Sequence, residues 1–193
     1  MSKFKHSEEG AEVNENPDLP KTIYREVEKT VRRMLSKDKA DPGVIDSITI
    51  NKLAEEQKDK GEFLANFYSL LVYNIANRAA LDKAEAWVRL VEELAAEQAE
   101  AQEKPEEFLQ NFYSLIVEYI AMGKSMDKKV IDSWMDFIEQ RVEEQSQNHK
   151  DPEEFMQNFY NMVLTKLVEI RLIKARSEFI TEDFIEDKEP END

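Results

Sequence analysis

The sequence predicts an all-α protein built from three tandem helical hairpins, and three observations lead to this prediction. The chain of 193 residues has only 4 Gly and 6 Pro, fewer turn-forming residues than a fold of many strands needs. Apolar residues recur at intervals of three and four along several long segments. One phrase is also repeated, as EFLANFY at 62–68, PEEFLQNFY at 105–113 and PEEFMQNFY at 152–160. A period of about 45–47 residues is typical of stacked hairpins, which form either a short α-solenoid or a compact bundle.

Composition limits the classes of function. Hydrophobic residues make up 41% of the chain, enough for a core, and no Cys is present, which excludes disulfides, thiolate metal sites and a Cys nucleophile. The net charge of −16 disfavours nucleic acid and anionic membranes as partners. The N-terminal sequence lacks the apolar segment of a secretory signal, and no apolar run is long enough to span a bilayer. We therefore expect a cytoplasmic protein without a membrane anchor.

The N-terminal region divides into a tail, a basic helix and a short helix. Residues 1–18 are polar and acidic without periodicity, which predicts a disordered tail. An amphipathic helix is expected from about 21 to 37, in the one basic segment of the protein. Asp41-Pro42-Gly43 predicts a break, after which a helix is expected from about 44 to 58.

The repeated phrase opens three long helices. They are expected at about 61–78, 105–122 and 152–175, with two further helices between them at about 81–102 and 126–147. The pattern predicts one all-α domain over residues 19–177, with units of about 43–79, 80–123 and 125–176. Residues 178–193 are acidic and are expected to form a disordered C-terminal tail.

A helical wheel assigns roles within the phrase. Phe108 and Phe112 fall within one wide apolar arc and are expected in the core. Asn111 and Tyr113 fall on opposite borders of this arc, so that the repeated Asn and Tyr cannot form a single recognition stripe. Each repeated Tyr is expected to pack its ring and to leave its hydroxyl in water. Gln110 and Ser114 are expected to face away from the core.

The repeated asparagines, Asn66, Asn111 and Asn158, allow two interpretations. They could face a ligand, as a row of amides that binds a peptide backbone. They could instead be half-buried groups that bond to the neighbouring hairpin and fix the register of the repeats. The second interpretation is favoured, because buried amides must form hydrogen bonds and stacked repeats need a defined register.

The last repeat helix carries a second apolar row of Leu164, Val168 and Leu172. The equivalent positions in the earlier copies hold Val72 with Ala76 and Val117 with Ala121, and no fourth repeat follows. Either another part of the chain, such as the basic helix, covers this row, or a partner does. A homo-oligomer through the last repeat helix is one form of the partner interpretation.

Two other segments are candidates for binding. The C-terminal stretch EFITEDFIED places two apolar pairs in an acidic context, Phe179-Ile180 and Phe184-Ile185. Such pairs are typical of short docking motifs, although they could also pack back on the body of the protein. The basic helix could contact nucleic acid, but docking against acids of the same chain is favoured because the rest of the protein is acidic.

The sequence contains no recognisable catalytic, cofactor-binding or metal-ligating constellation. Its two His residues, His6 and His149, lack the spacing of a metal site. We therefore expect a non-enzymatic protein–protein interaction scaffold or adaptor that uses the repeat surface, the acidic Phe-Ile motif or both. One alternative is an acidic DNA mimic or sink for basic proteins. Another is a small-ligand binder or enzyme with a site between the repeats.

Overall fold

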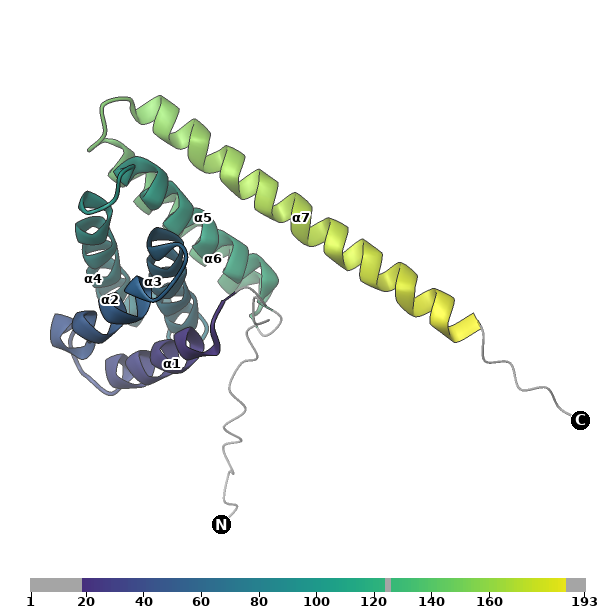
Figure 1. Ribbon diagram of the computed structural model, residues 1–193, viewed down its shortest axis with the longest axis horizontal. Coiled ribbons are helices and arrows are strands. Elements are labelled where there is room, and N and C mark those ends of the chain that lie inside the picture. Colours follow the sequence, from purple (N-terminus) through teal and green to yellow (C-terminus); the bar gives the residue numbers. More distant parts are fainter. Residues whose placement is uncertain (1–18, 124–125, 187–193) are drawn as a thin grey trace, which may run out of the picture.

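The computed structural model describes residues 19–123 and 126–186, and side chains as far as Arg171. All regular elements in the described part of the chain are helices, which confirms the all-α class (Figure 1). The tail expected at 1–18 lies outside the described residues, as do residues 187–193. No described helix is long and apolar enough to cross a membrane.

The N-terminal part of the domain contains three short elements. Helix α1 (Lys21–Leu35) lies within the predicted range, and the Asp-Pro-Gly break forms a 3-10 turn, η1 (Pro42–Val44). Helix α2 (Ser47–Glu55) is shorter than the helix expected at 44–58. It begins at Ser47 because the Asp46 carboxylate caps it, accepting a hydrogen bond of 3.1 Å from the backbone amide of Thr49.

Five longer helices follow in the predicted places. Their bounds are α3 (Lys60–Ala76), α4 (Leu81–Glu100), α5 (Pro105–Met122), α6 (Lys128–Ser146) and α7 (Pro152–Glu186). The Asp151 carboxylate caps the start of α7, because it accepts a hydrogen bond of 3.0 Å from the backbone amide of Glu154. Helix α7 continues to Glu186, so its end does not coincide with the boundary predicted after residue 177.

The three phrase-bearing helices pack in chain order. Helix α5 lies between α3 and α7, α4 contacts α3 and α5, and α6 contacts α5 and α7 (Figure 1). Helices α1 and α2 pack against α3. The hairpins α4–α5 and α6–α7 are alike in length until α7 extends beyond its counterpart, whereas α2 is much shorter than α4 and α6. The count of three repeats stays a prediction of the sequence period.

The phenylalanines of all three phrases are in the core, as the wheel predicts. Phe63, Phe67, Phe108, Phe112, Phe155 and Phe159 are each no more than 6% exposed. The core is deepest around α3, where every residue from Phe63 to Ala76 is buried. By contrast, the only buried residues in the described part of α7 are its first two phenylalanines.

The prediction that Gln110 and Ser114 face away from the core is wrong. Their exposed fractions are 4% and 0%. Helix α5 has neighbours on several sides, so a polar position on its wheel meets another helix instead of water. The Gln110 amide donates to the carbonyl of Phe155 on α7 at 3.4 Å, and the Ser114 hydroxyl donates to the carbonyl of Asn111 at 2.9 Å. Both side chains therefore satisfy their polar groups inside the domain.

The repeated tyrosines do not share one environment. Tyr68 and Tyr113 are each 1% exposed, whereas Tyr160 is 42% exposed. The expectation of a solvated hydroxyl is wrong for Tyr113, which donates to the buried carboxylate of Glu92 at 3.3 Å. Burial raises the pKa of the Tyr68 hydroxyl to about 12. The Tyr160 hydroxyl bonds to Glu139, which precedes it by the same 21 residues as Glu92 precedes Tyr113.

A buried ion pair joins α4 to α6. The Arg141 guanidinium contacts the Glu92 carboxylate through Nε at 2.9 Å and Nη2 at 2.8 Å. Because Tyr113 donates to the other oxygen of Glu92, the network connects α4, α5 and α6. Burial raises the pKa of Glu92, while Arg141 and Tyr113 act in the opposite direction.

Candidate functional site

The strongest candidate for a binding surface is an exposed apolar row on α7. Leu164 is 60% exposed and Val168 is 52% exposed. The residues at the same repeat positions in α3 and α5, Val72 and Val117, are 0% and 9% exposed. Leu164 is thus in water where the valines of the earlier copies are covered, whereas the counterparts of Val168 differ, since Ala76 is buried and Ala121 is exposed. We call Tyr160, Leu164 and Val168 the α7 apolar face.

The basic helix does not cover the α7 apolar face. Helix α1 packs against α3, which lies on the other side of α5 from α7. Its apolar residues Ile23, Val27, Val31 and Met34 are buried there, and Glu28 pairs with Arg78 at the end of α3. The prediction that α1 could cover Leu164 and Val168 within the chain is therefore wrong.

The remaining predicted partner-binding residues lie further along α7. The backbone of α7 includes Leu172, Phe179, Ile180, Phe184 and Ile185, all within one continuous helix. Their side chains lie outside the described residues. The Phe-Ile pairs expected on a disordered tail therefore lie within the backbone of a continuous helix.

The three repeated asparagines have different environments. Asn66 is 2% exposed, and its amide donates to the Glu62 carbonyl at 2.9 Å while its oxygen accepts from the Tyr119 hydroxyl at 2.6 Å. This contact joins α3 to α5, as expected for a residue that fixes register. Asn111 is half-buried beside a groove, and Asn158 is exposed.

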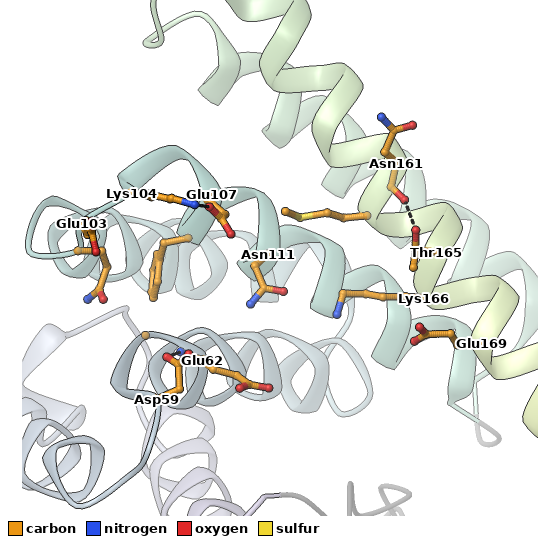
Figure 2. Close-up of a pocket in the computed structure, with 14 residues that line it drawn as sticks. Asp59, Glu62, Glu103, Lys104, Glu107, Asn111, Asn161, Thr165, Lys166 and Glu169 are labelled. Atoms are coloured by element: carbon orange, nitrogen blue, oxygen red, sulfur yellow. Dashed lines mark hydrogen bonds and ion pairs between the residues drawn. The ribbon is translucent and has the colours of Figure 1, made fainter.

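The groove beside Asn111 lies where α3, α5 and α7 meet, and it has a volume of about 750 Å³ (Figure 2). Its wall contains two lysines, each already paired with a glutamate: Lys104 with Glu107 at 2.8 Å and Lys166 with Glu118 at 3.4 Å. Five carboxylates also line it, from Asp59, Glu62, Glu103, Glu107 and Glu169. The excess of carboxylates favours cationic over anionic ligands in this groove.

A single difference between repeats accounts for the position of the groove. Aligning the phrases places Asn66 at the position of Asn111 and Tyr119 at the position of Lys166. Tyr119 reaches Asn66 and closes the contact of α3 with α5. In the contact of α5 with α7, Lys166 extends toward Asn111 (Figure 2). The Asn111 side chain forms no hydrogen bond with the described residues. A slender lysine leaves open the space that a tyrosine ring fills.

We expect Lys166→Tyr to raise the free energy of unfolding by about 0.5–1.5 kcal/mol, the usual worth of one new hydrogen bond. The new hydroxyl would reach Asn111 as Tyr119 reaches Asn66. Urea unfolding measures the change. Lys166→Ala is the matched control, because it removes the pair with Glu118 without filling the groove and should cost less than about 1 kcal/mol. Equal stability of the two variants would show that residue 166 does not close this contact.

A second pocket of about 740 Å³ adjoins the groove and shares Lys104, Glu107, Asn161 and Met162 with it. His149 lines this pocket, with its ring stacked on Phe155 at a centroid distance of 4.4 Å. Its Nδ1 lies 3.3 Å from a Glu106 oxygen, and its buried Nε2 has no partner among the described residues. No group of three potential metal-ligating side chains occurs in the described part of the chain.

Comparisons with known proteins do not assign a family. No model of a protein family matches the chain, and neither a curated protein nor a solved structure gives a significant match.

Proposed function

We propose that the protein is a non-enzymatic interaction module that binds another protein chain through the α7 apolar face. The observation that carries this proposal is the exposure of Leu164 at a position where Val72 and Val117 are covered in the earlier copies, together with the exposure of Val168 one turn further along α7. The chain as a whole is strongly charged, with 35% of its residues Asp, Glu, Lys or Arg. An apolar row that persists on such a surface is typical of a protein-binding site.

Burial of the α7 apolar face by a partner would stabilise a complex. Covering apolar surface stabilises a complex by about 25 cal/mol per Å², and one fully buried Leu or Val contributes about 1.5–3 kcal/mol. Two such side chains do not suffice for a stable complex, so the partner would also contact neighbouring positions of α7. The partly exposed Leu167 and Ile170 lie on the same helix and add to the available apolar area. The proposed location of this interaction is the cytoplasm.

A second candidate function is the binding of a small cationic ligand between the repeats. The groove at Asn111 favours it, because an unbonded amide and several carboxylates border one open volume. A thermal-shift screen of cationic compounds tests this candidate, with Lys166→Tyr as the variant that should abolish any shift. A ligand that stabilises both proteins equally would bind elsewhere.

The interaction proposal is tested by affinity capture with matched surface variants. Leu164→Asp with Val168→Asp is expected to lose the partner that the full chain retains at about 150 mM salt. The control is Ile48→Asp with Val130→Asp, which places the same two charges at exposed apolar residues of other helices. A further variant that ends at Ser177 shows whether the Phe-Ile positions of α7 are needed.

The capture experiment also separates the alternatives. A partner lost only with the α7 variant supports the proposal. Loss with both double variants, or with neither, contradicts it. If the full chain retains only a broad set of basic proteins that depend on salt and not on residues 164 and 168, the protein is a sink for basic proteins instead.

A further inference from the structure

Helix α7 is long, and among its described side chains only those near its start are buried. With 35 residues it measures about 52 Å, and its C-terminal part extends beyond the other helices (Figure 1). Phe155 and Phe159 are buried near its start, whereas no residue from 160 to 171 is buried. Isolated helices are marginal in water, and most helical stability in proteins comes from packing of an apolar face. The second half of α7 therefore needs a neighbour.

The sequence along α7 changes the sign of its charge. Residues 166–176 contain four basic residues and one acid, although the protein as a whole has a net charge of −16. Residues 178–186 contain four acids and no basic residue. The helix thus carries a basic segment followed directly by an acidic one.

One set of positions on α7 has a symmetric pattern. Leu164, Arg171, Glu178 and Ile185 follow each other at intervals of seven residues, which places them along one side of the helix. Within the part of α7 whose side chains are described, Leu164 and Arg171 are both exposed. The order along the helix is apolar, positive, negative, apolar. Reversing the direction of the helix exchanges the two charges and leaves the apolar ends in place.

We infer that α7 binds α7 of a second copy of this chain in an antiparallel helix pair; this inference rests on the proposed function and names its partner. A two-fold axis between Lys174 and Ala175 places Leu164 level with Ile185 of the second copy, and Arg171 level with Glu178 of the second copy. Such an interface is isologous and closes as a dimer. A parallel pair would instead place basic segments together and acidic segments together.

Charge complementarity favours a second copy over other partners. Two copies with a net charge of −16 repel each other in general, so a contact between them must pair opposite charges locally. Under this axis two of the basic residues of α7, Lys166 and Arg171, are level with two acids of the second copy, Asp183 and Glu178. The pairing also covers Leu164 and the positions that follow it along α7.

The test exchanges charges at one pair of positions. Light scattering after size exclusion, across micromolar concentrations, is expected to show twice the chain mass for the full chain. Arg171→Glu alone and Glu178→Arg alone each create two like-charge contacts per dimer and should weaken self-association at least about tenfold. Mixing the two variants restores both opposite-charge contacts and should restore the dimer. Circular dichroism confirms that each variant keeps its helices.

Each outcome decides for or against the pairing. A full chain that stays monomeric overturns it, as does a mixture of variants that remains monomeric. A dimer that neither variant weakens would use another surface, which also overturns the inference. If the full chain is monomeric and the Leu164→Asp, Val168→Asp variant still loses a captured protein, the proposed function stands and only the identity of the partner is wrong.

Discussion

Replacing Arg141 with alanine is expected to lower the free energy of unfolding by about 3–5 kcal/mol. The variant leaves the Glu92 carboxylate, of which only 7% is exposed, without its cation. The loss of both guanidinium contacts is not compensated by water, because α4, α5 and α6 enclose this carboxylate through the Glu92–Arg141–Tyr113 network. Urea unfolding monitored by circular dichroism measures the change.

Arg89→Ala is the matched control for this prediction. Arg89 pairs with Glu85 at 2.8 Å, but both side chains are 46% exposed, so its removal should cost less than about 1 kcal/mol. The double variant Glu92→Gln with Arg141→Met should recover part of the loss, because it removes the buried charge together with its partner. A similar cost for Arg89→Ala and Arg141→Ala would contradict the assignment of a buried ion pair.

The effect of Arg141→Ala should depend on pH. Burial already raises the pKa of Glu92 above its ordinary value of 4.5, and removal of the arginine should raise this pKa further. Between the ordinary and the raised pKa, the folded state binds more protons than the unfolded state, so stability rises as the pH falls through this window. The difference in unfolding free energy between Arg141→Ala and the unchanged protein should thus become smaller from about pH 7 to about pH 5.

Phe112→Ala is expected to cost about 3–5 kcal/mol of unfolding free energy. The Phe112 ring is fully buried in α5, with its centroid 4.8 Å from that of Tyr113. Its backbone carbonyl also lies 2.8 Å from the Ser69 hydroxyl of α3, so the site is at the contact between two repeats. Truncation leaves a cavity that helices held on several sides cannot collapse to fill.

Leu164→Ala provides the comparison for Phe112→Ala. Its side chain is 60% exposed, and the change should alter stability by no more than about 0.5 kcal/mol under conditions where the chain is monomeric. Both variants are measured by urea unfolding, with one common slope of unfolding free energy against urea concentration. A small effect at Phe112, or a large one at Leu164, would mean that the core and the exposed row are assigned to the wrong sides of the stack.

The helices and the core could be predicted from the sequence, because they depend on local periodicity. The apolar spacing of three and four places Phe108 and Phe112 on one side of a helix, and burial of that side follows from the hydrophobic effect. Asp151 before Pro152 likewise marks a helix start by local chemistry alone. A comparison of copies also points to Leu164, because smaller valines stand at its equivalent positions in α3 and α5.

Contacts between helices were harder to predict from the sequence. A single helical wheel assumes one buried side and one wet side, and Gln110 and Ser114 violate this assumption because α5 has neighbours on both flanks. The Glu92–Arg141 pair spans 49 residues, and no local pattern reveals it. The repeat period does hold a signal, since Glu92 and Glu139 both precede a repeated tyrosine by 21 residues. The groove similarly follows from the alignment of Tyr119 with Lys166, once the helices are known to be adjacent.

The continuous burial of α3 has a consequence for how the protein is made. A helix in which every residue from Phe63 to Ala76 is covered has no side that water can solvate while its neighbours are missing. On the ribosome α3 emerges before α4 and α5, which supply much of its cover. Until residue 122 has left the exit tunnel, the nascent chain exposes a segment that other chains could bind. Production of this protein thus has a vulnerable interval, which closes when α5 docks.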